Sequence, residues 1–428
     1  MRIRTVSKRY EEVLALTPKK HQKPLRTNPF FRTLLKVVSV PDLLAVHFRC
    51  NKIGMDRLKK DQPCLYLMNH SSFVDLEIAA SILFPRPFNI VATTDGFVGK
   101  NWLMRQIGCI PTKKFVSDLT LIKDISYAVK HLKSSVLMYP EASYSFDGTA
   151  TPLPDSIGRF IQRLGVPVVM IRTYGAFARD PLYNNLQRRK VRVSADMEYL
   201  LSPEDLARMT PEEINTAIGE KFNFDNFRWQ QENHVRIAEP FRADFLNRVL
   251  YKCPACGTEG QMQGKGTQIA CTCCGKAYAL DEYGLLHATE GETEFSHIPD
   301  WYAWERACVR EELLNGTYRI ETPVDICMSI DTKSIYRVGE GTLTHTENGL
   351  HLTGCDGKLD YHHAPLSSYS LYSDFNWYEI GDVICIGDHR ALYYCFPKTD
   401  RDVVAKARLA AEELFKIALA QRREHATR

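Results

Sequence analysis

Short apolar runs alternate with amphipathic or turn-rich sequence through the first half of the chain. The runs occupy residues 64–68, 88–92, 135–139 and 166–173. Runs of this length bounded by polar residues are typical of buried strands, and the longer segments between them are typical of helices and turns. The alternation predicts an α/β domain with a mixed, mostly buried sheet, which we expect to occupy residues 1–245.

The segment that precedes the first of these strands has a different pattern. Residues 29–48 place hydrophobic side chains near helical spacing with basic residues between them, which predicts an amphipathic helix broken near Pro41. This helix either packs on its own domain or lies in the head-group layer of a membrane, and both interpretations remain open. The first 25 residues are basic and are interpreted as a loosely held arm at the surface.

The second half of the chain divides into three parts. Residues 246–290 contain two pairs of cysteines around a glycine-rich hairpin, and residues 291–315 predict a linking helix. Residues 316–428 contain short alternating segments separated by turn residues, which predict a small antiparallel β domain. The stretch at residues 401–424, rich in alanine, leucine and charge, predicts an amphipathic helix that closes this domain. We therefore expect a multi-domain protein.

Composition limits the partners and the compartment. The chain has 428 residues, 44% of them hydrophobic, which is enough to bury more than one core. A net charge of only +4 carries no general polyanion-binding signature, and the segment with the paired cysteines has few basic residues, so no nucleic-acid partner is expected. Thirteen cysteines without an opening signal peptide favour a reducing cytosol over disulfides. No uncharged apolar run approaches the roughly 20 residues of a spanning helix, so we expect a cytoplasmic protein without one.

The residues from Asn69 to Asp75, NHSSFVD, are candidates for acyl-transfer chemistry. Transfer of an acyl group from a thioester to an alcohol requires a base for the hydroxyl proton and a group that orients the base. His70 directly follows a predicted strand, and Ser72 with Asp75 predicts a helix cap that turns Asp75 back toward the imidazole. Asp75 would then accept from Nδ1 and leave Nε2 as the base. A hydrogen-bonded structural histidine is the alternative, because this spacing alone is weakly specific.

A second block strengthens the catalytic interpretation. The strand that ends at Tyr139 continues into Pro140-Glu141-Ala142-Ser143-Tyr144-Ser145, and a glutamate at a strand end is unusual. Together the ordered blocks NHSSFVD, GCIPTKK, YPEASYS and GVPVVMI resemble the phosphate acyltransferase family that makes phosphatidic acid from 1-acylglycerol-3-phosphate. The resemblance spans about residues 60–200. It implies a lysophospholipid acceptor, acyl-CoA or acyl-carrier protein as donor, and peripheral association with the inner face of a membrane.

The resemblance also implies which residues bind substrate: Asn69, Ser71, Gly108, Lys113, Lys114, Glu141, Ser143 and Ser145. The sequence departs from the family pattern at two places where the family binds the phosphate of the acceptor. Lys114 stands where the family usually has arginine, and Ala142 to Tyr144 replace the usual Gly-Thr-Arg. A lysine keeps the charge but loses the two-pronged contact that arginine makes with phosphate. The acceptor is therefore either 1-acylglycerol-3-phosphate, another lysolipid or an amino-acid-based lipid. A non-catalytic membrane scaffold is a further alternative, which the intact His70, Asp75 and Glu141 oppose.

The paired cysteines form a candidate metal site. Two CxxC pairs are separated by fourteen residues, and the predicted ligands are Cys253, Cys256, Cys271 and Cys274. This spacing is typical of zinc ribbons, in which four thiolates leave no open position, so the expected Zn²⁺ is structural. Cys273 is interpreted as a bystander. A redox dithiol is the competing hypothesis, but no βαβ pattern surrounds the motif.

The C-terminal β domain resembles the pleckstrin-homology (PH) superfold in its strand pattern, its run of aromatic residues and its closing helix. That resemblance implies docking to a membrane or a head group. A domain that packs on the rest of the protein or contacts another protein remains the alternative.

Overall fold

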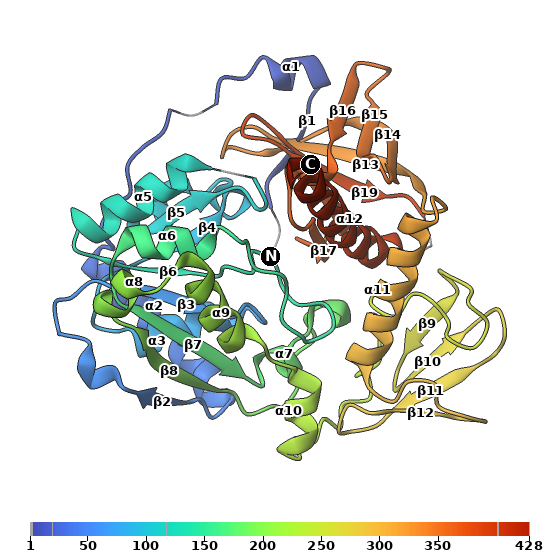
Figure 1. Ribbon diagram of the computed structural model, residues 1–428, viewed down its shortest axis with the longest axis horizontal. Coiled ribbons are helices and arrows are strands. Elements are labelled where there is room, and N and C mark those ends of the chain that lie inside the picture. Colours follow the sequence, from blue (N-terminus) through green and yellow to red (C-terminus); the bar gives the residue numbers. More distant parts are fainter. Residues whose placement is uncertain (1–2, 19, 117, 400–401, 428) are drawn as a thin grey trace. The chain divides into compact units, whose positions relative to one another are not determined.

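The computed structural model describes the chain at residues 3–18, 20–116, 118–399 and 402–427. These residues group into two compact units (Figure 1). The first, here called the α/β unit, contains residues 20–181 and 187–235. The second, here called the β-rich unit, contains the described residues of 1–19, 182–186 and 236–428. The expected multi-domain organisation is confirmed.

A sheet of seven strands, counted over the described residues, forms the centre of the α/β unit. Its order is β2-β8-β7-β3-β6-β4-β5, and each neighbouring pair is parallel except β7 with β8. The sheet is therefore mixed, as the sequence predicted. The strands are β2 (Arg49–Ile53), β3 (Leu65–Met68), β4 (Phe88–Thr93), β5 (Cys109–Thr112), β6 (Ser135–Met138), β7 (Val168–Tyr174) and β8 (Ser194–Leu201).

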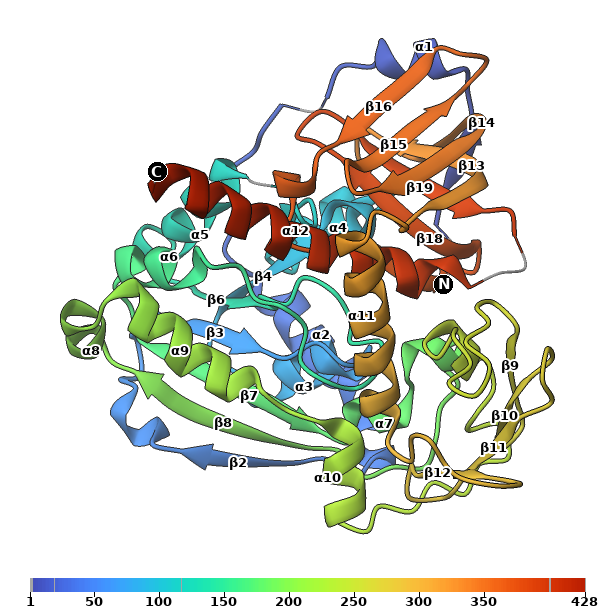
Figure 2. The same cartoon turned by 45° about the vertical axis from the view of Figure 1, so that its right-hand side comes forward.

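Helices bury both faces of this sheet. One face packs with α2 and α3 in a core that includes Leu43 and Ile78. The other packs with α5, α6 and α9 in a core that includes Ile125 and Ile161, and Figure 2 shows α9 alongside β7 and β8. The helices are α2 (Pro29–Ala45), α3 (Val74–Ile82), α4 (Asn101–Gln106), α5 (Leu119–Lys130), α6 (Ile157–Leu164), α7 (Ala176–Arg179), α8 (Pro203–Arg208), α9 (Pro211–Phe222) and α10 (Asn226–Glu232).

Helix α2 differs from the prediction because it continues through Pro41 without a break. The side chain of Asn28 accepts from Phe30 N at 2.9 Å and starts the helix. Ser39 and Leu43 are both buried, so packing holds the helix on each side of the proline and overrides its helix-breaking tendency. The opposite side of α2 leaves large apolar side chains exposed: Phe30, Leu34, Val37, Val38, Val40 and Leu44.

No helix within the described part of the chain is both long enough and apolar enough to cross a membrane.

The β-rich unit contains two sheets joined by α11 (Ile298–Leu314), and the strands named below pair antiparallel in both. The smaller sheet has the order β12-β11-β10-β9 and carries the paired cysteines. Its strands are β9 (Met262–Lys265), β10 (Gln268–Cys271), β11 (Ala277–Leu280) and β12 (Leu286–Ala288).

The larger sheet has the order β16-β15-β14-β13-β19-β18-β17 and is followed by α12 (Val403–Thr427). Figure 2 shows α12 running along this sheet, and it contacts β17 and β18. The antiparallel strands and the terminal helix that the sequence predicted for residues 316–428 are therefore both present. The strands are β13 (Ile320–Ser329), β14 (Ile335–Thr346), β15 (Gly349–Gly354), β16 (Leu359–His363), β17 (Tyr372–Trp377), β18 (Gly381–Gly387) and β19 (Leu392–Pro397).

The N-terminal residues differ from the predicted loose arm and do not join the α/β unit. Strand β1 (Thr5–Ser7) pairs in parallel with β14, with Thr5 opposite Ile335. In α1 (Tyr10–Leu14), Tyr10 and Val13 are buried. Backbone pairing and apolar burial thus attach these residues to the β-rich unit.

Helix α11 connects the two sheets of the β-rich unit through buried polar contacts. Trp301 Nε1 donates to Lys252 O at 3.0 Å, and the buried Glu305 accepts from Lys252 N at 2.8 Å. The next residue, Arg306, forms ion pairs with Glu412 and Glu413 of α12 at 2.7 and 3.2 Å. The cysteine module, the linking helix and the C-terminal domain, predicted as separate parts, consequently group as one compact unit.

Candidate active site

The candidate site lies at the carboxyl end of β3. Strands β6 and β7 flank β3 and are parallel to it, so the residues that follow these strands meet at one edge of the sheet. His70 follows β3, and Glu141 follows β6. The loop between β3 and α3 presents the NHSSFVD segment at this edge.

Asp75 orients the imidazole of His70. His70 Nδ1 lies 3.1 Å from Asp75 Oδ2. The same oxygen accepts from the backbone N–H groups of Ser71 at 2.8 Å and Ser72 at 3.0 Å. Ser72 Oγ accepts from Val74 N at 3.2 Å, but the predicted cap by Ser72 is wrong, because the N-cap of α3 is Phe73 and its side chain makes no capping hydrogen bond. A proton on Nδ1 that points to Asp75 leaves Nε2 as a proton acceptor.

The environment of His70 favours the neutral base. Burial lowers the pKa of His70, and the charge of Lys114 lowers it further, whereas Asp75 acts in the opposite direction. The imidazole is also stacked between two aromatic rings, with centroid distances of 4.3 Å to Tyr139 and 4.0 Å to Tyr144. A neutral imidazole held in one orientation is suited to general-base chemistry.

Glu141 and Asn69, both predicted to bind substrate, also hold the loop that carries His70, and their contact with substrate stays a prediction. Glu141 is buried, and it accepts from His70 N at 3.0 Å and from Thr151 N at 2.9 Å. Asn69 Oδ1 accepts from Thr173 N at 2.8 Å, which ties the end of β3 to β7. These contacts fix the backbone on both sides of the imidazole.

The predicted serines also bind the protein itself. Ser71 Oγ accepts from Asn69 Nδ2 at 3.1 Å, and Ser143 Oγ donates to Tyr144 O at 3.1 Å. Ser145 Oγ donates to Thr149 O at 2.6 Å and shapes the loop after β6. All three serines are buried. Their contacts therefore shape the loops around His70, and direct substrate binding by them stays a prediction.

The GCIPTKK block spans the sheet from one edge to the other. Lys113 and Lys114 follow β5 at the carboxyl edge, where Lys114 acts on His70. Gly108 precedes β5 and lies at the amino edge, away from the candidate site. It has φ +85°, and a Cβ there would lie 2.4 Å from Thr27 Oγ1, so a glycine is needed for space. Gly108 therefore lies apart from His70 in the sheet, and direct substrate binding by it stays a prediction.

Sequence reasoning missed several side chains that support the site. Ser72 Oγ donates to Asp180, which also accepts from Arg179 Nη1 at 2.7 Å. Burial raises the pKa of Asp180 to about 6. Ser72 and Asp180 are far apart in sequence, so no local pattern links them. Tyr139 and Tyr144 belong to the YPEASYS block, but nothing in the sequence predicted that their rings stack on His70.

Residues 49–173 match the acyltransferase family model. This range includes both the His70–Asp75 pair and Glu141. A chloroplastic 1-acyl-sn-glycerol-3-phosphate acyltransferase of Brassica napus is 31% identical over 127 residues, covering 28% of this chain and 36% of the relative. The corresponding Arabidopsis thaliana protein is 27% identical over 133 residues, covering 30% and 36%. The chain thus spans about a third of the length of these relatives.

Among solved structures, the chain is similar to the 1-acyl-sn-glycerophosphate acyltransferase PlsC from Thermotoga maritima. The sequence identity is 15% and the TM-score is 0.37, with coverage of 48% of this chain and 80% of that protein.

The four predicted metal ligands come together in the β-rich unit. All four sulfurs, of Cys253, Cys256, Cys271 and Cys274, lie within 4.8 Å of one another, and two of the separations are 3.7 and 3.8 Å. Tetrahedral zinc with Zn–S bonds of about 2.3 Å separates its sulfurs by about 3.8 Å, so the donor set fits this ion. Gly257 and Gly275, each one residue after a CxxC pair, have positive φ and complete the tight turns.

Proposed function

We propose that the α/β unit transfers a fatty acyl group from a thioester donor to the hydroxyl group of a lysophospholipid. The leading acceptor is 1-acylglycerol-3-phosphate, which would give phosphatidic acid. The observation that carries this proposal is the His70–Asp75 pair, held by the Ser71 and Ser72 backbone within the range that matches the acyltransferase family model. The names of the two plant relatives support the same acceptor.

The mechanism is direct transfer between two bound substrates. His70 Nε2 removes the proton of the acceptor hydroxyl, and the resulting alkoxide attacks the thioester carbonyl. The carboxylate of Asp75 stabilises the imidazolium that forms. Collapse of the tetrahedral intermediate releases the thiolate, which takes the proton from His70 and leaves as a thiol. No covalent acyl-enzyme is needed, because the acceptor oxygen itself is the nucleophile. The donor is acyl-CoA or acyl-carrier protein.

A second acceptor class is favoured by one observation. Tyr144 stands where the related family carries a phosphate-binding arginine, and its ring covers one face of His70 at 4.0 Å. An aromatic ring at that position offers packing surface instead of a charge. This favours another lysolipid or an amino-acid-based lipid as the alternative acceptor.

The proposed location is a membrane surface on the cytoplasmic side. The support is the exposed apolar side of α2, where Phe30 and Leu44 are 67% and 69% exposed. A helix that buries one side in its own unit and exposes apolar residues on the other can lie in the head-group layer. In this proposal one side of α2 packs on its own unit, and the other side lies in the head-group layer of the membrane.

The β-rich unit is proposed to combine a structural zinc ribbon with a PH-like domain. Four thiolates would hold the Zn²⁺ and leave no position for a substrate, so the metal would stabilise the fold of the small sheet. The strand order of the large sheet and the terminal α12 support the PH-like assignment. Docking of this domain to a membrane or a head group is part of the same proposal.

A labelled-donor assay tests the proposed activity. Purified full-length protein would be incubated with labelled acyl-CoA or acyl-carrier protein and a panel of lysolipids, and both thiol release and lipid product would be measured. We expect His70→Ala to reduce the rate by about 10² to 10⁴, the usual contribution of a general base. The matched control is His131→Ala, which replaces the exposed histidine directly after α5 and should keep the wild-type rate.

Two outcomes would contradict the proposal. A wild-type rate in His70→Ala would exclude the assigned base. Wild-type protein that releases no thiol with any lysolipid would favour the scaffold alternative.

A further inference from the structure

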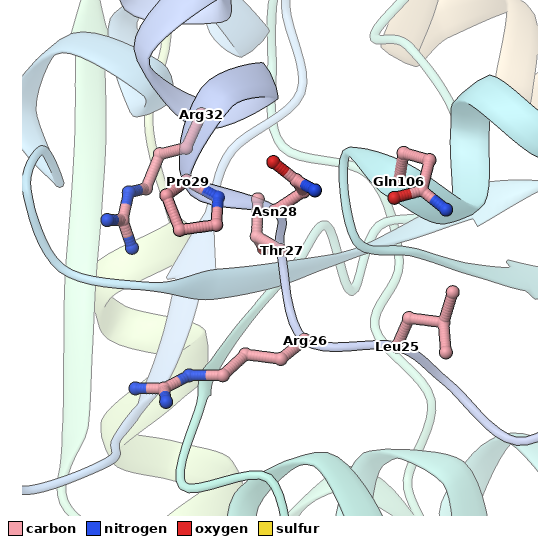
Figure 3. A pocket seen from close by; sticks show the side chains of 7 residues that line it. All are labelled: Leu25, Arg26, Thr27, Asn28, Pro29, Arg32 and Gln106. Carbon is pink, nitrogen blue, oxygen red and sulfur yellow. The ribbon is translucent and has the colours of Figure 1, made fainter.

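The segment that leads into α2 crosses the amino edge of the α/β sheet and encloses a pocket there. Asn89 Nδ2 donates to Leu25 O at 2.7 Å, and Asn28 N donates to Gln106 O at 3.0 Å. The pocket has a volume of about 540 Å³, and Arg26, Arg32 and Gln106 are among the residues that line it (Figure 3). His70 lies at the carboxyl edge of the same sheet, so this pocket is distinct from the candidate active site.

Two arginines in this pocket lack a counter-charge. In the part of the chain that the structure describes, neither Arg26 nor Arg32 forms an ion pair, and Arg32 Nε is buried without a hydrogen-bond partner. Figure 3 shows both guanidinium groups extending toward the same side of the segment. Burial and the neighbouring charge of Arg26 lower the pKa of Arg32. Arginine does not lose its proton in proteins, so the repulsion remains until an anion offsets it.

Exposed aromatic side chains lie on the same two helices as the pocket residues Arg32 and Gln106, with Phe30 on α2 and Trp102 on α4. Phe30 and Trp102 are 67% and 66% exposed. The ring of Phe31 contacts both of them edge-on, at centroid distances of 5.2 and 5.7 Å. The first turn of α2 has no acidic residue. Aromatic rings beside basic groups are characteristic of the layer where lipid tails meet head groups.

We propose that Arg26 and Arg32 bind the phosphate of an anionic phospholipid in the leaflet that Phe30 and Trp102 enter. Guanidinium groups suit this ligand because they make charge-assisted hydrogen bonds to phosphate oxygens. The inference rests on the membrane contact of the proposed function and adds the chemistry of the lipid that is recognised. This lipid is bound at the amino edge of the sheet and is not consumed by the reaction at the carboxyl edge.

Vesicle binding by the full-length protein tests this inference without any acyl donor. Binding would be measured with phosphatidylcholine vesicles and with vesicles that also contain phosphatidylglycerol. We expect the Arg26→Gln/Arg32→Gln variant to weaken binding to the anionic vesicles roughly 10- to 30-fold, given the contribution of two basic residues at a charged surface. Binding to the neutral vesicles should not change. Arg163→Gln/Arg208→Gln, with the same charge change on α6 and α8, is the matched control and should bind both vesicles nearly as wild type does.

The outcomes separate this inference from the proposed function. If both double variants lost the same amount of binding to the anionic vesicles, the effect would come from net charge and not from this pocket, and the inference would be overturned. Displacement of the protein from anionic vesicles by soluble glycerol phosphate would assign the pocket to a free phosphate instead of a lipid, and would also overturn it. Wild-type protein that binds neither vesicle would contradict the membrane contact itself. Acylation of detergent-dispersed substrate should be unchanged in Arg26→Gln/Arg32→Gln, and matching thermal unfolding curves would verify that the variants are folded.

Discussion

The protonation of a single imidazole sets the chemistry proposed for the α/β unit. The side chain of His70 is only 18% exposed to solvent, and its ring lies between two aromatic rings. Its neutral form is favoured by burial and by Lys114, while Asp75 favours the imidazolium. The balance between these influences suits a base that must first accept a proton and later return it.

Replacing Lys114 by methionine should move the acidic limb of the pH–rate profile to higher pH. A positive charge disfavours the imidazolium and lowers the pKa of His70, so its removal raises that pKa. More of the base is then protonated at a given low pH, and the rate there falls. The dependence of kcat/KM on pH measures the effect. Lys113→Met is the control, because it removes the same charge from the neighbouring residue, and equal displacement in both variants would contradict the assignment of this effect to Lys114.

Replacing Tyr144 by arginine should favour phosphate-bearing acceptors. A charge-assisted hydrogen bond to phosphate contributes about 1.5–3 kcal/mol, which corresponds to a preference of roughly 10- to 100-fold. The measurement is the ratio of kcat/KM for 1-acylglycerol-3-phosphate to that for a lysolipid without a terminal phosphate. Tyr144→Phe keeps the ring that stacks on His70 and should leave the ratio unchanged. An unaltered ratio in Tyr144→Arg would show that residue 144 does not face the acceptor's head group.

For single residues, the sequence predicted which side chains belong to the candidate site better than it predicted the contacts between them. The spacing and order of the blocks picked out His70, Asp75 and Glu141, and the structure brings all three to one edge of the sheet. The same reasoning did not reveal that Glu141 binds the His70 backbone or that Asp180 holds Ser72. Such contacts join residues from different strands, and their partners are set by the packing of the whole sheet.

Individual strands and helices formed where the pattern of apolar and polar residues predicted them, provided that the packing of the whole unit favoured the same structure. The buried strands were predicted close to their observed positions because apolar runs between polar residues have few alternatives in a two-sided α/β sheet. Helix α2 departed from prediction at Pro41, since Ser39 and Leu43 are buried on either side of it. The cysteine pairs were recognisable because metal ligation imposes a fixed spacing that survives without any packing information.

The cysteine module provides a test at the scale of one element. Cys256→Ser should abolish stoichiometric zinc binding, because a structural site needs all four thiolates, and should loosen the hairpin of β10 and β11. Zinc content by atomic emission and hydrogen exchange across that hairpin would measure both effects. Cys273→Ser is the matched control and should retain the metal, since Cys273 lies outside the group of four sulfurs. Loss of zinc in both variants would contradict the ligand assignment.

For the whole molecule, the division into units was the least predictable property. The sequence pattern marks where one kind of element gives way to another, but it does not say which elements pack together. Residues 3–18 illustrate the point, because nothing in their composition indicates pairing with β14. Likewise, the buried Glu305 and the ion pairs of Arg306 join modules that look independent along the chain.

Removing residues 1–14 should expose one side of β14. Ile335 N donates to Arg4 O at 2.9 Å, and Lys8 N donates to Arg337 O at 3.1 Å, so the truncation removes these backbone bonds. We expect faster hydrogen exchange at Ile335 and its neighbours. Strand β17, at the other end of the large sheet, serves as the internal control and should keep its protection. Unchanged exchange at β14 would contradict the observed pairing.

The parallel pairing of β1 with β14 also has a consequence for the order of events on the ribosome. Chains emerge from the N-terminus onward, and domains generally fold as units during synthesis. Strand β1 leaves the ribosome before the α/β unit, yet its partner begins only at Ile335, after the whole α/β unit has been made. The residues of β1 therefore lack their partner strand throughout translation of the α/β unit, and a chaperone that binds short exposed segments would find them accessible for that entire interval.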